Sequence, residues 1–254
     1  MSTFHWLDAL KSWFSGEKKR PALQAVPAGG TANHRQGSVK EVMDPAQALN
    51  GARVTIPVDA QIFDNEPVWL QWGEPGSPGA YRTNVQNKPP LLPGTRDFKV
   101  PPEMVRWHIG KEVIVRYEVQ EPGVAVPHKS EDYPITISLV AGTTTLQSEQ
   151  IEDERMSARV TASFTLPAWP VMNTDQHVTV KVTGYTLAGE LWTYTVANKK
   201  PVTQAGSPVA VGSISSANLG KFERDQTLEI TTEVSFDGNL TVQPFRTLRP
   251  LLTN

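Results

Sequence analysis

The 254-residue sequence contains no cysteine. The fold therefore has no disulfide framework, and thiolate nucleophiles and thiolate-bound zinc or iron–sulfur sites are excluded. The chain is long enough for two domains of about 100 residues each, the usual domain size. A domain of that size can bury an adequate core without covalent cross-links.

The sequence also lacks a continuous apolar run long enough to cross a bilayer. The apolar residues near the N-terminus are interrupted by polar ones, and no basic residue precedes them, so they do not have the pattern of a secretory signal. We therefore predict neither a signal peptide nor a transmembrane segment. An extracellular or cell-surface location reached by a leaderless route is favoured.

Recognisable catalytic motifs are missing as well. The sequence has no Gly-x-Ser-x-Gly elbow for a hydrolase triad, and Gly29-Gly30 does not lie between a strand and a helix as a phosphate loop would. The histidines do not stand at the spacing of a metal-binding pair. We predict no enzyme activity, no cofactor and no metal. The five histidines are His5, His34, His108, His128 and His177.

Charge of one sign is not in large excess, since the net charge is −2. Residues 1–40 carry six basic and two acidic side chains, whereas residues 41–254 carry 18 basic and 24 acidic ones. A mildly acidic body argues against binding to nucleic acid, which requires a basic face. The basic N-terminal segment is compatible with an anionic membrane or partner surface.

An internal repeat is the most prominent positive feature of the sequence. The segment 53–111 recurs at an offset of 110 residues, with Pro57 matching Pro167 and Gly79 matching Gly189. Recurrence at a constant offset is the sequence signature of duplication. The sequence therefore predicts two related domains.

The register of the repeat changes once, after a shared Gly-Lys pair. Beyond it Val113 corresponds to Leu228, an offset of 115, because five residues near 222–226 are inserted in the second copy. Insertions are tolerated in loops, so this position is predicted to be a loop that differs between the copies.

Alternating apolar residues in both copies predict strands that each have one buried face. Strands that recur with Gly- and Pro-rich turns between them, such as Asp237-Gly238, indicate an all-β fold made of sandwiches. We assign residues 43–140 to the first sandwich, 141–157 to a polar connector and 158–254 to the second sandwich.

The N-terminal residues 1–16 have the helical spacing of a short amphipathic helix, and residues 17–42 have the composition of a flexible linker. The favoured interpretation is that the helix packs on the first sandwich or on another copy of the chain. The second interpretation is an interfacial helix that contacts a membrane surface. The apolar stripe consists of Phe4, Trp6, Leu7, Leu10, Trp13 and Phe14.

The chain resembles the tandem bacterial immunoglobulin-like repeats of large Gram-negative surface and secreted proteins. The first copy carries the resemblance in "LNGARVTIPV", "VWLQW", "IGKEVIVRYEV" and "YPITIS", and the second in "LGKFERDQTLEITTEVSFDG" and "FRTLRP". The resemblance covers residues 43–254. It implies two tandem immunoglobulin-like β-sandwiches with spacer, adhesive or recognition roles and without catalysis. The paired cysteines and the tyrosine-corner signature of antibody domains are absent.

Trp69 is a further candidate contact residue, because the alternation that buries Leu70 and Trp72 turns its side chain to the opposite face. An outward tryptophan lies under a loop or the neighbouring repeat, which we favour, or it marks a contact surface.

The function that fits these features best is a non-enzymatic binding or adhesion module of a bacterial surface or secreted protein, with an unidentified protein or glycan partner. The first alternative is a membrane-interacting secreted effector or toxin that uses the tryptophan-rich helix. The second is a structural component of a virion or secretion assembly, in which the helix mediates self-association.

Overall fold

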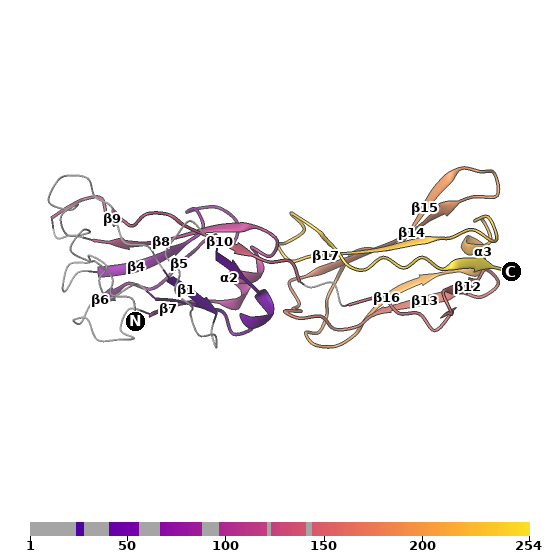
Figure 1. Cartoon of the computed structure of the whole chain (residues 1–254), viewed down its shortest axis with the longest axis horizontal. Coiled ribbons are helices and arrows are strands. Elements are labelled where there is room, and N and C mark those ends of the chain that lie inside the picture. Colours follow the sequence, from indigo (N-terminus) through magenta and orange to yellow (C-terminus); the bar gives the residue numbers. More distant parts are fainter. Residues whose placement is uncertain (1–23, 28–40, 56–66, 88–96, 121–122, 141–143) are drawn as a thin grey trace, which may run out of the picture. The chain divides into compact units, whose positions relative to one another are not determined.

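The computed structural model (Figure 1) describes residues 24–27, 41–55, 67–87, 97–120, 123–140 and 144–254. The expected N-terminal helix and its six apolar contact residues lie outside these residues, and so does most of the expected linker. The described chain is mostly β-structure arranged in several sheets. It divides into two compact units, Met1–Ser138 and Leu139–Asn254.

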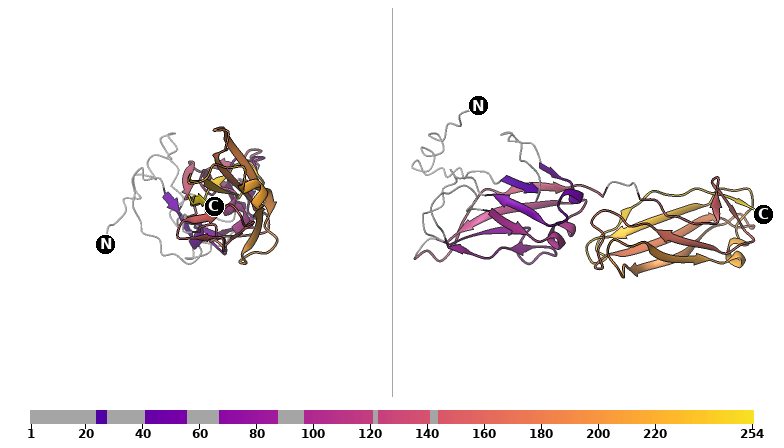
Figure 2. Two further views of the ribbon diagram at one scale, coloured as in Figure 1. Left: turned by 90° about the vertical axis from the view of Figure 1, so that its right-hand side faces the viewer. Right: turned by 90° about the horizontal axis from the view of Figure 1, so that it is seen from below.

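The described residues of unit 1 (residues 1–138) form two sheets. One has the strand order β1-β3-β7, and the other has the order β2-β10-β8-β4-β5, with β6 and β9 pairing at its end. The two sheets form separate layers (Figure 2). The strands of the first sheet are β1 (Gln24–Pro27), β3 (Ala52–Thr55) and β7 (Asp97–Val100). Those of the second are β2 (Glu41–Met43), β10 (Tyr133–Ile137), β8 (Glu112–Val119), β4 (Pro67–Trp72), β5 (Tyr81–Arg82), β6 (Gln86–Asn87) and β9 (His128–Lys129).

The alternation of inward- and outward-facing residues along the strands explains the core of unit 1. Along β3, Val54 is buried whereas Arg53 is exposed, and along β4 and β8 the residues Leu70, Trp72 and Val115 are fully buried. The short helix α2 (Pro102–Arg106) follows β7 and begins with proline, which suits the first turn of a helix. A shorter 3-10 helix, η1 (Pro45–Gln47), follows β2.

Unit 2 (residues 139–254) also has one larger sheet, with the order β15-β14-β17-β18, and smaller sheets β13-β16 and β11-β12-β19. Its strands are β11 (Ile151–Glu152), β12 (Arg155–Ser157), β13 (Ala162–Leu166), β14 (His177–Tyr185), β15 (Leu191–Pro201), β16 (Val209–Ile214), β17 (Glu229–Ser235), β18 (Gln243–Pro244) and β19 (Leu251–Thr253). The short helix α3 (Ser216–Leu219) lies between β16 and β17, and Ser215 caps it by accepting a hydrogen bond from the Asn218 amide.

The central strand pairs of the two units have corresponding registers. Leu70 is opposite Tyr117 in the β4–β8 pair, and Val180 is opposite Thr232 in the β14–β17 pair. These pairs differ by 110 residues on the first strand and 115 on the second. The strand pairing of unit 2 therefore follows that of unit 1 across the inserted residues.

The strand order within each unit is that of an immunoglobulin-like sandwich. In unit 2, β13 and β16 occupy the positions of strands B and E, and β15, β14 and β17 occupy those of C′, C and F. In unit 1 the same positions are taken by β3 with β7 and by β5, β4 and β8. In each unit the last strand runs parallel to a strand from the earlier part of the unit: β10 beside β2 in unit 1, and β19 beside β12 in unit 2.

The structure differs from the expected boundaries in two places. Gln24–Pro27, within the range assigned to the linker, pairs with β3 as strand β1. Strands β11 and β12 lie in the range assigned to the connector, and Met156 of β12 is fully buried. Both segments are too short to show a period in the sequence, and their pairing depends on a partner strand elsewhere in the chain.

Candidate functional site

Trp69 is buried, which agrees with the favoured interpretation that its side chain is covered and not with the alternative that it is an exposed contact residue. Its side chain lies on the face of β4 opposite Leu70 but is only 4% exposed. Its Nε1 donates a hydrogen bond of 2.9 Å to Glu118 Oε2, and the Arg82 guanidinium carbon lies 4.0 Å from the ring centroid. A glutamate and an arginine on the two neighbouring strands thus cover the ring and satisfy its N–H.

Glu118 belongs to a charged network on the same face of the sheet. Arg116 donates to Glu118 at 3.4 Å, to Glu74 at 3.2 Å and to Asp132 at 3.4 Å. Burial alone would lower the pKa of Arg116, but the hydrogen bonds and charges of Glu74 and Asp132 raise that pKa above its ordinary value. Because the guanidinium is paired on several sides, the carboxylates offset the cost of burying its charge, and its donors are occupied by groups of the same unit.

Unit 2 does not repeat this network. The positions that correspond to Trp69, Arg116 and Glu118 are occupied by Thr179, Thr231 and Glu233, and Lys181 stands where unit 1 has Gln71. Lys181 Nζ lies 3.9 Å from Glu233 Oε2, and both side chains are partly exposed. A single exposed pair of this kind contributes little to stability.

His108 and Tyr133 are the titratable groups of unit 1 with the clearest electrostatic perturbation apart from Arg116. Burial lowers the pKa of His108, and the charge of Lys111 lowers it further, against the effect of the Met104 carbonyl. Burial raises the pKa of Tyr133, whose hydroxyl donates a hydrogen bond of 2.5 Å to Glu41. Each group contacts the body of its own unit, and among the described residues no three histidine or acidic side chains are placed to hold a metal ion.

Unit 2 instead exposes an apolar hairpin formed by β14, β15 and the turn between them. Tyr185 is 53% exposed, Leu187 70% and Leu191 66%. The hairpin is closed by hydrogen bonds from the Gly189 amide to the Thr186 carbonyl and from the Thr186 amide to the Glu190 carbonyl. Several large exposed apolar side chains on one hairpin are typical of contact surfaces. We call Tyr185, Leu187 and Leu191 the hairpin cluster.

The base of the hairpin is fixed to the core through aromatic contacts. The Trp192 ring lies 4.8 Å from the fully buried ring of Phe222 and 6.0 Å from Tyr194, between centroids. Lys221 Nζ lies 5.1 Å from the centroid of Trp192. The hairpin is therefore held at its base while its tip stands clear of the rest of unit 2 (Figure 1).

The corresponding hairpin of unit 1 does not have this surface. After Trp72 the chain leaves the sheet at Gly73 and passes through the turn residues Pro75 and Pro78 before β5 begins. In unit 2 the same stretch continues as paired strands, so that Thr183 is opposite Thr193 and Tyr185 opposite Leu191. The sequence signal for this difference is the uninterrupted run from Leu191 to Ala197, which has neither proline nor charge.

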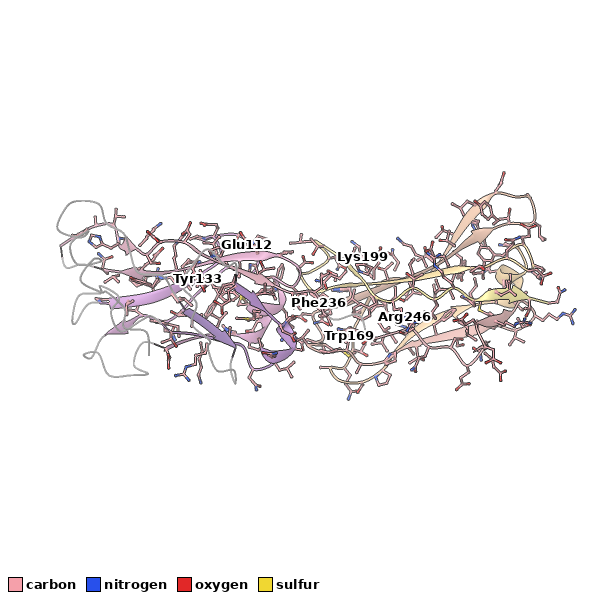
Figure 3. All side chains as sticks on the ribbon, in the orientation of Figure 1. Glu112, Tyr133, Trp169, Lys199, Phe236 and Arg246 are labelled. Atoms are coloured by element: carbon pink, nitrogen blue, oxygen red, sulfur yellow. The ribbon has the colours of Figure 1, made fainter. Side chains whose placement is uncertain are left out.

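β15 is also an edge strand. It is the terminal strand of the order β15-β14-β17-β18, and within the described part of the chain no strand pairs with the other side of residues 191–195. Farther along, Lys200 donates hydrogen bonds to the carbonyls of Ala210 and Val211 on β16. Figure 3 shows Lys199 at the end of β15 that lies away from the hairpin tip.

No helix among the described residues is long and apolar enough to span a membrane.

Comparisons with known proteins identify no family. No family model matches the chain, and no curated protein matches it. Among solved structures the chain is similar to one entitled "Marsupial T cell receptor", with 10% sequence identity and a TM-score of 0.34. That match covers 91% of this chain and 71% of the other. A likeness of this degree carries no functional argument.

Proposed function

We propose that this chain is a non-enzymatic binding or adhesion module of a bacterial surface or secreted protein, built from two tandem immunoglobulin-like domains. The hairpin cluster is the observation that carries the proposal. Three large apolar side chains on a single hairpin are each more than half exposed. Exposed apolar side chains lower solubility and add nothing to the core. They are typical of a surface that a partner covers.

The support for the hairpin also favours binding. Trp192 rests on Phe222, so the strand that carries Leu191 is ordered before a partner arrives. A surface that is already ordered loses little conformational entropy on association, and a larger share of the contact energy then appears as affinity. Reactive groups contribute nothing to this mode of action, which depends on the shape and polarity of the exposed surface.

Binding can be tested with the fluorescently labelled full chain on a glycan array and on immobilised collagen and fibronectin. We expect retention on at least one of these surfaces, and we expect the double variant L187S/L191S to lose it. The matched control is L240S/V242S, which changes two exposed apolar residues in the turn after β17. Equal retention by both variants would show that the hairpin cluster is not the binding surface.

The alternative is a membrane-interacting effector that uses the N-terminal apolar stripe, and it is supported by the basic residues Lys18, Lys19 and Arg20 that follow that stripe. It predicts that the full chain floats with anionic liposomes, that added salt reduces flotation, and that W6S/W13S abolishes it. Flotation of that variant at the level of the unchanged chain would exclude this use of the stripe. Self-association through the same stripe would favour the assembly-component alternative.

A further inference from the structure

We propose that β15 pairs in antiparallel fashion with β15 of a second copy of this chain, about a two-fold axis at Thr193. This inference rests on the proposed binding role of the β14–β15 hairpin and names one partner for it. It concerns the backbone edge of the hairpin, whereas the hairpin cluster concerns the side chains at its tip.

The hydrogen-bond alternation of the hairpin identifies which backbone groups face outward. The Thr186 amide donates to the Glu190 carbonyl, so Thr186 and Glu190 form a hydrogen-bonded pair. Bonded and non-bonded pairs alternate along an antiparallel ladder, which makes Thr183 and Thr193 a non-bonded pair. Their hydroxyl oxygens lie 2.9 Å apart, as expected for the pair type with the closer side chains.

It follows that Leu191, Thr193 and Thr195 direct their amide and carbonyl groups away from β14. These three residues lie on the side of β15 that no described strand covers. A row of outward backbone donors and acceptors is a template for another strand. An added strand that meets all three residues would continue the sheet with the same ladder.

The composition of the edge lacks the usual protection against such pairing. From Leu191 to Asn198 the chain has no charged residue, no proline and no glycine, and it is rich in threonine and aromatic residues that favour strands. The edge strand of unit 1 is different, because β5 contains only Tyr81 and Arg82. Short strands and charged side chains are two ways in which proteins block edge pairing.

A second copy is the partner that this edge fits best. An axis at Thr193 places Leu191 opposite Thr195 of the partner chain, and these pairs are hydrogen-bonded because all their backbone groups face outward. Trp192 is then opposite Tyr194 of the partner chain in a non-bonded pair, where side chains come closest. Cross-strand aromatic pairs stabilise sheets, and the symmetry forms this pair twice.

Charge does not oppose this arrangement. Glu190 lies opposite Val196 of the second copy, so neither chain places a charge against a like charge within the paired segment. Two-fold pairing through one self-complementary patch is the commonest form of homodimer. Of the hairpin cluster, Leu191 lies within the paired segment, whereas Tyr185 and Leu187 lie outside it and stay available for another partner.

The test is sedimentation velocity of the full chain at increasing concentration, with the variants T193K and T193E measured alone and as an equimolar mixture. We expect the unchanged chain to shift from monomer to dimer, each single variant to remain monomeric, and the mixture to recover the dimer. The reason is that residue 193 faces itself across the axis, so like charges repel and opposite charges attract. T195K is the matched control: it places the same charge on the same strand, but opposite Leu191, and should reduce dimer formation less.

Recovery in the mixture shows that the variants are folded, and no further folding control is then needed. A chain that is monomeric at every concentration overturns the inference, as does a T193K variant that still dimerises. Dimerisation that W6S/W13S abolishes and T193K leaves unchanged overturns it in favour of the N-terminal stripe.

If the chain is monomeric but L187S/L191S loses array binding, the proposed pairing with a second copy is wrong and the proposed binding function stands. If dimerisation follows the expected pattern but no array surface is bound, the proposed binding to surface ligands fails and the dimer stands.

Discussion

Thr232 shows how a single buried atom affects stability. Its side chain is 1% exposed in the core of unit 2, and its Oγ1 has no hydrogen-bond partner among the described residues. A buried hydroxyl without a partner costs free energy, because it has lost its hydrogen bonds to water without replacing them.

We expect Thr232→Val to raise the free energy of unfolding by about 1 kcal/mol, since valine has nearly the same shape and needs no hydrogen bond. Urea unfolding followed by circular dichroism would measure the change. The control is Thr179→Val on the adjacent strand β14, where Oγ1 accepts a hydrogen bond of 3.1 Å from the Lys199 amide. That variant should lose stability, and a gain of similar size in both would disprove the explanation.

His108 predicts a pH dependence in unit 1. Because its pKa in the folded state is lowered from the ordinary value of 6.5, the unfolded state binds the proton more readily. Stability is therefore fully present above pH 6.5 and is lost as the pH falls below that value. We expect the melting temperature to decrease in this range, and His108→Gln to remove part of the decrease. An unchanged decrease in His108→Gln would assign it to other groups, and His128→Gln, at a partly exposed position, serves as the control.

At the residue scale, the alternation of apolar and polar residues predicts much of the core, but it does not predict whether every large side chain is buried. The burial of Leu70, Trp72 and Val115 follows from it directly. Trp69 stands at the opposite phase and is nevertheless buried, because Arg82 and Glu118 reach over it from neighbouring strands. Coverage of this kind depends on the order of strands in the sheet, and that order is not a local property of the sequence.

Among the elements, the β4–β5 and β14–β15 turns allow a direct comparison. Gly79 and Gly189 stand at corresponding positions and have nearly the same φ, +76° and +77°. A Cβ atom at Gly79 would lie 2.7 Å from the Cβ of Trp107, whereas at Gly189 it would meet nothing within 4 Å. The two positions therefore share the backbone strain of a substitution and differ in crowding.

We expect Gly189→Ala to cost about 1 kcal/mol from the left-handed conformation alone. Gly79→Ala should cost about 1–3 kcal/mol more, because the added methyl group forces a shift of the packed Trp107. Thermal and urea unfolding of the two variants measure the difference. Equal losses would mean that the turn of unit 1 relaxes around the methyl group.

At this scale the sequence predicts the longer strands and the Asp237-Gly238 turn between β17 and β18, but it does not show how that turn is held. Asp237 is 1% exposed and accepts hydrogen bonds from Ser235, Leu240 and Thr241. The strands β1, β11 and β12 were not predicted, because each is short and forms only where a partner strand is available. The hairpin cluster was also missed, since exposed leucines have no distinctive local pattern.

For the whole molecule, the proposal of two tandem domains predicts that unit 2 folds without unit 1. We expect a chain of residues 139–254 to unfold cooperatively in urea and to show the circular dichroism of a β protein, because its core lies within the unit. A chain of residues 139–254 that lacks a cooperative transition would contradict independent folding. Because the two units have corresponding strand registers, we expect their unfolding transitions to be similarly cooperative and to differ mainly in the urea concentration at the midpoint.

The parallel pairs β2–β10 and β12–β19 have a mechanical consequence. In each pair a strand from the earlier part of a unit lies beside the last strand of that unit and runs in the same direction, as in the register of Met156 with Leu252. A pulling force applied to the two ends of unit 2 acts along β12 and β19 in opposite directions. The hydrogen bonds between β12 and β19 are then loaded together in shear instead of opening one after another. Unit 2 is therefore expected to resist a force that pulls its two ends apart.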